Sequence, residues 1–198
     1  MSGLSISPRN KLQRNQILLD KEQSLLFVID IQEKFRPAIP GLNTVIANTS
    51  ILLQAAKQLE IPTVFSEQYP KALGATVTEL LQHKSNEAPI FSKMEFSAAL
   101  AEGVVEYVRQ QHPSQIVICG VETHVCVLQT ALDFAANLDC KVYVVVDAVA
   151  SRKSQDHEAA LRRLEHHGIE LITTEMAVFE WLKVSGTAEF KSLQKLIK

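Results

Sequence analysis

The sequence predicts one α/β domain, a three-layer α/β/α sandwich around a six-stranded, mainly parallel sheet. Short apolar runs rich in Val and Ile alternate with longer segments of helical period, which is typical of strands and helices that follow one another along the chain. Several runs are apolar at nearly every position, as expected of strands that are covered on both faces. A chain of 198 residues, 46% of them hydrophobic, is long enough to form one such core.

The strands and helices are expected in strict alternation. Six strands are expected at residues 24–31, 62–66, 88–93, 115–120, 141–147 and 169–174. The main helices are expected at 42–59, 97–111, 124–138 and 154–168, with further helical segments from 176 and 187. Gly168 is suited to a left-handed cap at the end of its helix, and Thr76 with Glu79 forms a capping-box pattern that predicts a short helix there.

Domain organisation is simple, because no repeat, low-complexity tract or linker interrupts the pattern. The polar opening, residues 1–20, is expected to form an N-terminal arm, and residues 21–198 the domain. No run approaches the ~18 apolar residues of a membrane span, and the N-terminus has no apolar segment of signal-peptide length.

Charge and cysteine content narrow the classes of function. Twenty basic and 22 acidic residues give a formal net charge of -2, so there is no electrostatic reason to expect a nucleic acid or a membrane as partner. Three cysteines without a C-x-x-C pair indicate free thiols in a reducing compartment. We therefore expect a cytoplasmic protein with a small-molecule substrate.

Three reactive side chains fall at the ends of expected strands. Asp30 lies near the end of the first strand, Lys93 ends the third, and Cys126 follows the fourth. Because ligands of open α/β sheets bind at the carboxyl ends of the strands, we expect the three to share one edge. Cys126 is also expected in the first turn of a helix, where free N–H groups and the helix dipole stabilise a thiolate.

Each of these residues alone has an ordinary structural explanation. A strand-end aspartate caps a loop, a lysine lies at the surface, and a helical cysteine packs in the core. Cys119 and Cys140 are expected to be such packing thiols. The coincidence of three complementary groups at one edge is what favours a catalytic site.

Three segments carry a resemblance to a known family. Asp30-Ile-Gln32, Phe91-Ser-Lys93 and Cys119-Gly-Val-Glu-Thr-His-Val-Cys126 together resemble the isochorismatase-like cysteine hydrolase superfamily, whose members include nicotinamidases and N-carbamoylsarcosine amidases. The segment 66–74, Ser-Glu-Gln-Tyr-Pro-Lys-Ala-Leu-Gly, is similar to the isochorismatase domain-containing subgroup.

The resemblance implies a set of structural features. It implies the sheet order 3-2-1-4-5-6, a catalytic triad of Asp30, Lys93 and Cys126, and a cis peptide bond between Val121 and Glu122. It also implies an oxyanion hole formed by the backbone N–H groups of Glu122 and Cys126, and a homo-oligomer, dimeric or larger. Three roles remain open for the Glu122 side chain: substrate selectivity, solvent exposure or a subunit interface.

The activity that follows is cleavage of a small amide or related C–N bond through a thioester on Cys126. The alternatives are a vinyl-ether hydrolase of isochorismatase type and a non-catalytic small-molecule-binding or scaffold protein; a thiol redox protein would lack a resolving cysteine nearby. A papain-like pair of His124 and Cys126 is disfavoured, because residues at i and i+2 of a helix do not face each other.

No metal and no other cofactor is expected. Nicotinamidases of the superfamily bind a metal through an aspartate and two histidines, whereas this chain has Glu67-Gln68-Tyr69 in the matching region. Phe35 and Tyr69 follow the first and second strands, so each is a candidate for a substrate-pocket wall or for a plain core position.

Overall fold

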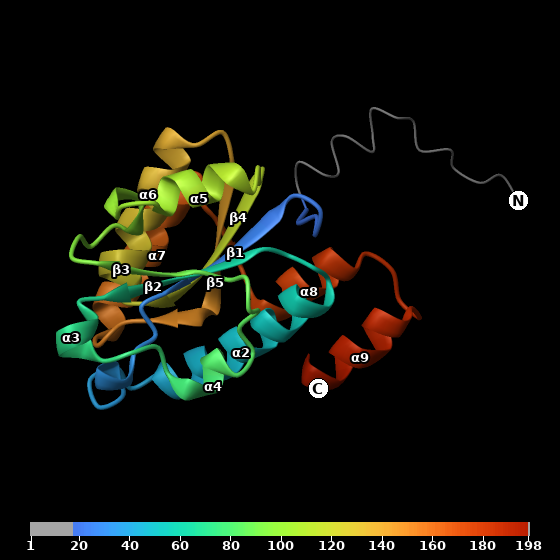
Figure 1. Ribbon diagram of the computed structural model, residues 1–198, viewed down its shortest axis with the longest axis horizontal. Coiled ribbons are helices and arrows are strands. Elements are labelled where there is room, and N and C mark those ends of the chain that lie inside the picture. The colour runs from blue at the N-terminus through green and yellow to red at the C-terminus, as the bar shows by residue number, and fades with distance from the viewer. Residues whose placement is uncertain (1–17, 198) are drawn as a thin grey trace, which may run out of the picture.

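The protein is a six-stranded parallel sheet between two layers of helices (Figure 1), as the computed structural model of residues 18–197 shows. The strand order is β3-β2-β1-β4-β5-β6, which confirms the expected order. All neighbouring strands are parallel, so their carboxyl ends lie at one edge of the sheet. The strands are β1 (Ser24–Ile29), β2 (Thr63–Gln68), β3 (Ile90–Lys93), β4 (Gln115–Val121), β5 (Lys141–Ala150) and β6 (Glu170–Ile172).

The helices divide between the two faces of the sheet. On one face lie α2 (Leu42–Gln58), α4 (Thr78–Leu81), α8 (Thr174–Leu182) and α9 (Ala188–Ile197). On the other lie α5 (Val104–Gln110), α6 (Leu128–Asn137) and α7 (Ser154–His166). Short helical turns complete the connections: η1 (Glu33–Phe35), α3 (Pro70–Leu73), η2 (Ala98–Leu100) and η3 (Thr123–Val127).

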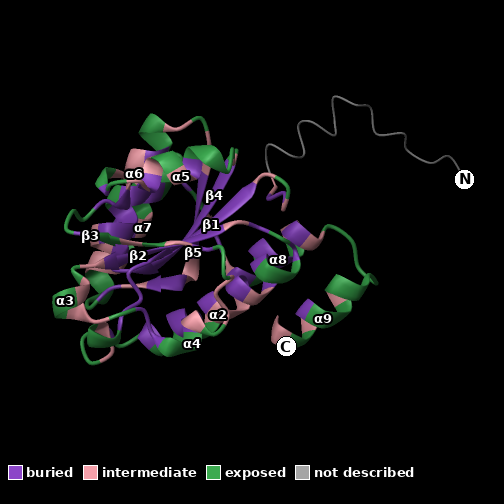
Figure 2. Ribbon diagram, in the orientation of Figure 1, coloured by how far each residue is buried: buried purple, intermediate pink, exposed green. Residues whose placement is uncertain are grey.

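Alternating side chains of the strands build two separate cores. Leu26 and Val28 of β1 belong to the cluster under α2 and α8, whereas Leu25 and Phe27 belong to the cluster under α5 and α6. This is the period-two alternation of a strand, here apolar in both directions because both faces are covered. Figure 2 shows the result, with buried strands at the centre and exposed residues on the outer helix faces. The central strands therefore form a fixed frame for the residues at their ends.

Two expected helix boundaries differ from the structure. The segment 97–111 is not one helix, because Gly103 adopts a positive φ of 80° and separates η2 from α5. The capping box at Thr76 is wrong: α4 begins at Thr78, and no side chain caps it. Thr76 instead donates its backbone N–H and its hydroxyl to Glu67 Oε1, at 2.7 and 2.8 Å. The left-handed conformation expected at Gly168 is confirmed, with φ at 80°.

The expected N-terminal arm lies outside the described residues up to position 17. Its last residues pack on the domain, since Leu19 is 1% exposed and donates its N–H to Glu180 Oε2 at 2.7 Å. Asp20 is also buried, and its carboxylate lies 2.7 Å from Lys183 Nζ.

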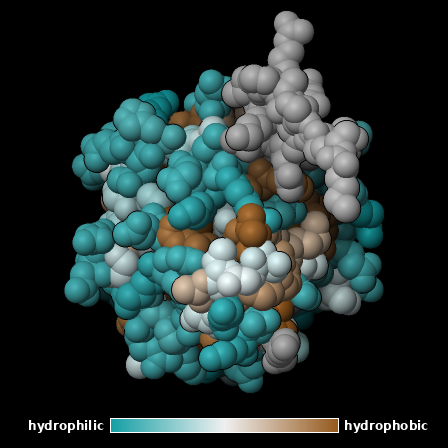
Figure 3. All heavy atoms as spheres, turned by 90° about the vertical axis from the view of Figure 1, so that its right-hand side faces the viewer, coloured by the Kyte–Doolittle hydropathy of each residue, from teal (hydrophilic) through white to brown (hydrophobic). Residues whose placement is uncertain are grey.

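Apolar side chains reach the surface beside α8. Met176 and Phe179 of this helix and the following Val184 are exposed. Figure 3 views the side on which α8 and α9 lie, and hydrophobic atoms are gathered there among hydrophilic ones. No helix within residues 18–197 is both long and apolar enough to cross a membrane.

Candidate active site

Asp30 is held at the end of β1 by an unusual backbone. Its φ is 53°, in the left-handed region that aspartate tolerates better than most residues, and its N–H donates to the Ser66 carbonyl at 3.0 Å. On the other side, Gly120 of β4 pairs with Ile29, and a Cβ at position 120 would lie 2.0 Å from the Ile29 oxygen. Both neighbouring strands therefore fix where the Asp30 side chain leaves the sheet.

Asp30 and Lys93 form a fully buried ion pair. Asp30 Oδ2 lies 2.7 Å from Lys93 Nζ, and both side chains are 0% exposed. The other carboxylate oxygen accepts a hydrogen bond from Ser66 Oγ at 2.8 Å. Burial raises the pKa of Asp30, while the Lys93 charge and the hydrogen bonds from Lys93, Ser66 and Cys126 oppose that rise. Such a pair contributes little to stability, because the cost of removing two ions from water offsets their attraction.

Cys126 lies next to this pair and is 6% exposed. Its thiol interacts with both Asp30 and Lys93, so the three predicted residues are brought together at one edge of the sheet. Burial raises the pKa of Cys126 to about 12; the Asp30 charge adds to the rise and the Lys93 charge opposes it. At neutral pH the sulfur is therefore a thiol.

The local structure around Cys126 corrects the expectation of a stabilised thiolate. Thr123–Val127 form a π-helical turn, η3, and α6 begins only at Leu128. Cys126 is thus not in the first turn of an α-helix, and desolvation is the largest cause of its raised pKa. A π-turn is frequent at functional sites, but nothing in the residue pattern distinguishes it from an ordinary helix start.

Two residues of β2 complete the site, and sequence reasoning had assigned them no role. Ser66 contacts Asp30, and Gln68 Oε1 lies 2.6 Å from Lys93 Nζ and 4.0 Å from Cys126 Sγ. β2 lies between β1 and β3, so its alternate residues 66 and 68 face the space between Asp30 and Lys93. The signal was the period-two spacing at the end of this strand, combined with the sheet order.

The peptide bond between Val121 and Glu122 is cis. The Glu122 side chain is 8% exposed and accepts hydrogen bonds from Arg152, through the backbone N–H at 2.9 Å and through Nε at 3.0 Å. The side chain is therefore not exposed to solvent, which was one of the three roles left open for it. It contacts Arg152, in the segment after β5.

The remaining candidate residues have other contacts. His124 Nδ1 lies 2.9 Å from Ser151 Oγ, and its Nε2 lies 3.9 Å from Asp156, so its ring is engaged away from Cys126. Phe35 is half-buried against the core cluster that contains α2. Tyr69 is 45% exposed, and its backbone N–H donates to the Lys93 carbonyl at 2.9 Å.

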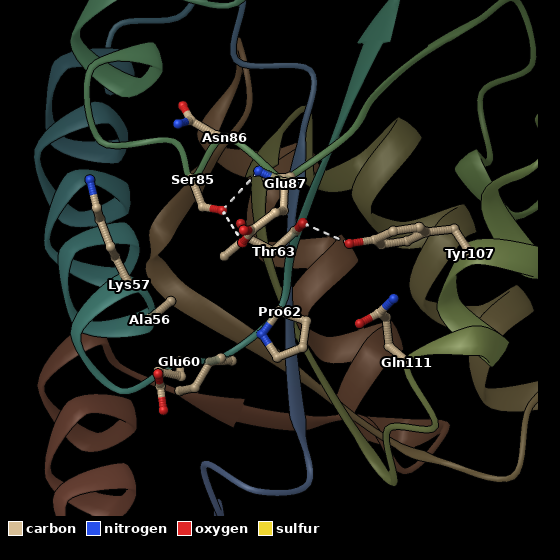
Figure 4. Close-up of a pocket in the computed structure, with 12 residues that line it drawn as sticks. Ala56, Lys57, Glu60, Pro62, Thr63, Ser85, Asn86, Glu87, Tyr107 and Gln111 are labelled. Atoms are coloured by element: carbon tan, nitrogen blue, oxygen red, sulfur yellow. Dashed lines mark hydrogen bonds between the residues drawn. The ribbon is translucent and has the colours of Figure 1, made fainter.

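Of the cavities beside the sheet, two lie at opposite ends of the strands. One, of about 600 Å³, lies at the carboxyl edge beside Glu122 and its partner, and its lining includes Gly41, Ser151, Arg152 and His157. The other, of about 480 Å³, lies at the start of β2 (Figure 4). There Tyr107 points toward Thr63 and donates to its carbonyl at 3.4 Å. This second cavity lies at the opposite end of the strands from Asp30, Lys93 and Cys126.

The described residues form no cluster of metal-ligating side chains. Among residues 18–197, no group of three or more His, Cys, Asp or Glu side chains is placed to hold a metal ion. Glu67, in the region matching the metal ligands of nicotinamidases, instead accepts two hydrogen bonds from Thr76.

The comparison with known proteins identifies the family. Residues 24–176 match the family model for the Isochorismatase domain. The secreted isochorismatase effector Isc1 of Phytophthora sojae is 40% identical over 179 residues, 88% of this chain and 84% of that protein. Isochorismatase family protein 1A of Dictyostelium discoideum is 38% identical over 182 residues, 90% of this chain and 87% of that one. The chain belongs to the isochorismatase family.

Solved structures agree with this fold. MAR1 ribonuclease from Caenorhabditis elegans superposes with a TM-score of 0.85 at 37% identity, over 91% of this chain and 92% of that one. The YcaC gene product of Escherichia coli, described as an octameric hydrolase of unknown specificity, has a TM-score of 0.83 at 24% identity, over 91% and 90% of the two chains. The chain therefore has the isochorismatase-family hydrolase fold.

Proposed function

We propose that the protein is a metal-independent cysteine hydrolase that cleaves a small amide or a related C–N bond. The observation that carries the proposal is the ion pair of Asp30 and Lys93, 2.7 Å apart with both side chains 0% exposed and in contact with the Cys126 thiol. A fold selected only for stability gains little from two buried charges, whereas a nucleophile, a base and a cation at one point form a reactive set.

The reaction begins with transfer of the Cys126 proton to the Asp30 carboxylate. The sulfur then bonds to the carbonyl carbon, and the electron pair of the C=O bond moves to oxygen. Lys93 stabilises the negative charges as the proton leaves the sulfur, because its ammonium contacts both partners. The backbone N–H groups of Glu122 and Cys126 are proposed as the oxyanion hole, where the loss of one donor typically reduces the rate by ~10²–10³.

Collapse of the tetrahedral intermediate breaks the C–N bond. Protonated Asp30 donates its proton to the leaving nitrogen, and a thioester remains on Cys126. Asp30, again a carboxylate, then takes a proton from water, which attacks the thioester carbon. The C–S bond breaks, the acid product leaves, and the proton on Asp30 returns to the sulfur. One carboxylate thus serves both half-reactions.

The test is a panel of small amides, ureas and nicotinamide, with intact-mass detection of an acyl adduct. We expect at least one compound to add its acyl mass to the wild-type chain, and no adduct on Cys126→Ala. An adduct or turnover that persists in Cys126→Ala would contradict the covalent mechanism. Turnover of a vinyl ether without any adduct would favour the alternative hydrolase, and ligand binding without turnover would favour a binding protein.

Ribonuclease activity, which the name of the Caenorhabditis elegans relative records, is not proposed for this chain. The formal net charge of -2 supplies no excess of cations for a phosphate backbone. Phe35 and Tyr69 remain proposed walls of the substrate pocket, because they follow β1 and β2 at the carboxyl edge.

We infer that the protein forms a homo-oligomer through apolar surface near the edge strand β3. Met94, Phe96 and Leu100 follow this strand and are 63%, 56% and 68% exposed. Exposed apolar side chains gathered in one region favour association. Light scattering after gel filtration is expected to give a dimer or larger species, with a shift toward monomer in Leu100→Lys. A monomeric wild type would contradict the inference.

A cytoplasmic location is proposed on the basis of the free thiols Cys119, Cys126 and Cys140. The Phytophthora sojae relative is named as secreted, which makes location a property to test in this chain. Fractionation of cells that express the full chain, with recovery only in the medium, would contradict this proposal.

A further inference from the structure

The side chain of Gln68 lies between the cation and the sulfur of the site. Its Oε1 accepts a hydrogen bond from Lys93 Nζ at 2.6 Å and lies 4.0 Å from Cys126 Sγ. Its Nε2 donates to the Met94 carbonyl at 2.9 Å. Because an ammonium only donates and a carbonyl only accepts, these two partners fix which end of the carboxamide faces the sulfur. The oxygen end faces it.

The backbone of Gln68 is held in place by a buried neighbour. Gln32 is 0% exposed; its Oε1 accepts the Gln68 N–H at 2.8 Å, and its Nε2 donates to the Gln68 carbonyl at 3.0 Å. Gln32 Nε2 also donates to the Gly74 carbonyl at 2.6 Å. In addition, Gln68 pairs with Lys93 across the β2–β3 ladder. The carboxamide therefore has a fixed base and two fixed partners, and rotation of its oxygen away from the sulfur would break both side-chain contacts.

This placement opposes formation of the thiolate. A carbonyl-type oxygen accepts a hydrogen bond from S–H, but it presents its negative end to S⁻. Lys93 Nζ has three protons and four acceptors: Asp30 at 2.7 Å, Gln68 at 2.6 Å, and the Glu95 and Phe96 carbonyls at 3.2 Å each. The sulfur, which Lys93 also contacts, therefore competes for these three protons with four oxygen acceptors, of which Gln68 Oε1 is the nearest.

Other titratable groups on the elements around η3 bind elsewhere. Those in or directly bonded to η3 and its flanking residue are Glu122, paired with Arg152; His124, next to Ser151 and Asp156; and His157 of α7, whose Nδ1 lies 2.9 Å from Thr123 Oγ1. The groups that face the sulfur are therefore Asp30, Lys93 and Gln68.

We propose that Gln68 restrains ionisation of Cys126 in the ligand-free site, so that the nucleophile is released only when a ligand displaces the contact between the carboxamide oxygen and the sulfur. The proposal rests on the proposed function in one respect, that Cys126 is the nucleophile. It adds a regulatory role for a neutral residue outside the triad: a resting thiol is protected from chance electrophiles and oxidants, which attack thiolates.

The test compares two variants of similar length that differ in charge. In Gln68→Met, the oxygen and its dipole are gone and one acceptor fewer competes with the sulfur for the Lys93 protons, so alkylation of Cys126 by iodoacetamide at pH 8.5 is expected to be about threefold faster or more. In Gln68→Glu, a negative oxygen stays beside the sulfur, and alkylation is expected to be about threefold slower or more. The rates are read at Cys126 by peptide mass spectrometry across a pH series.

A merely structural role for Gln68 would loosen the site in both variants and accelerate both. Rates that change in the same direction, or that both stay within about twofold of wild type, would overturn the proposal. Gln54→Met is the matched control, because Gln54 lies on α2 and donates to the Ser50 carbonyl of its own helix. If Gln68→Glu does not fold, the pH series on Gln68→Met decides alone: the midpoint of the Cys126 alkylation profile is expected to move to lower pH, and an unchanged midpoint would overturn the proposal.

Alkylation needs no substrate, so this test and that of the proposed function fail separately. Alkylation rates that shift in opposite directions in the two Gln68 variants, together with turnover that survives Cys126→Ala, would support the role of Gln68 and contradict the covalent hydrolase mechanism. Equal alkylation rates in the two variants, together with an acyl adduct on Cys126, would contradict the role of Gln68 and support the covalent hydrolase mechanism.

Discussion

Two thiols seven residues apart show what separates a packing cysteine from a candidate nucleophile. Cys119, inside β4, and Cys126, in η3, are both buried, and burial raises the pKa of each to about 12. The sulfur of Cys119 lies 3.8 Å from the Phe27 carbonyl, and the hydroxyl of Thr49 opposes part of its shift. No charged side chain contributes to that shift.

Cys126 differs through its neighbours and not through its depth. Asp30 and Lys93 both act on its proton, one against ionisation and one for it. The comparison teaches that burial of a thiol is not informative alone, and that a base within reach of the proton is the distinguishing feature. Four predictions test this contrast.

The largest expected effect is on turnover. Cys126→Ala is expected to reduce kcat by about 10³-fold or more for any substrate found with the amide panel, because the thioester cannot form. Cys119→Ala is expected to keep turnover within a fewfold of wild type. The measurement is steady-state kinetics on both variants, with circular dichroism to confirm that each is folded. Equal losses in the two variants would remove the contrast.

The second effect is on stability around the triad. Asp30→Asn leaves the buried Lys93 ammonium without a counter-charge, so the free energy of unfolding is expected to fall by about 3–5 kcal/mol. The double variant Asp30→Asn, Lys93→Met removes both charges and is expected to recover most of that loss. Urea unfolding of the two single variants and the double variant gives the coupling energy. A coupling near zero would mean that the two charges do not interact.

The third effect is a pH dependence of stability that comes from Cys119. Its pKa is 9.0 in the unfolded chain and about 12 in the folded one, so the folded state retains the proton longer. Stability is therefore lost as the pH rises above about 9, and the share from this thiol is on the order of 1–1.5 kcal/mol at about pH 10. Urea unfolding of wild type and Cys119→Ala near pH 8 and pH 10 measures it. A wild-type loss no larger than that of the variant would contradict the assignment.

The smallest expected effect is on stability, from loss of the Arg152 side chain. This side chain contacts Glu122, the residue just before η3. Arg152 is 59% exposed at its side chain, and its backbone N–H would still reach the Glu122 carboxylate in Arg152→Ala. The free energy of unfolding is therefore expected to fall by only about 0.2–1 kcal/mol. Arg162→Ala is a control on an exposed pair with Glu158, expected near zero. A larger loss in Arg152→Ala would show that the guanidinium orders the turn that carries Cys126.

Much of the fold could be predicted from the sequence, because period and composition report burial. The six strands lie where apolar runs were found, and their order followed from the family resemblance. The errors arose where tertiary contacts compete with local signals. Thr76 bonds to the buried Glu67 instead of capping a helix, and Gly103 ends a segment whose periodicity continues past it.

The candidate site was only partly predictable. Asp30, Lys93 and Cys126 stand out because charges and thiols are rare at the ends of apolar strands. Ser66 and Gln68 do not stand out, since polar residues at the end of a strand are ordinary, and their role depends on which strands flank β2. The thiol character of Cys126 also needed coordinates, because desolvation depends on packing and not on neighbours in sequence.

The close approach of Gly120 to Ile29 has a consequence for reading mutational scans of this protein. A methyl group at position 120 would overlap the oxygen just before Asp30, the proposed general base, so every substitution there should be as harmful as loss of the sulfur itself. The two positions are intolerant for different reasons. A side chain at position 120 overlaps the backbone, whereas a substitution at position 126 removes the proposed nucleophile. A scan scored by activity alone would merge them, whereas one scored by protein abundance would separate the glycine from the cysteine.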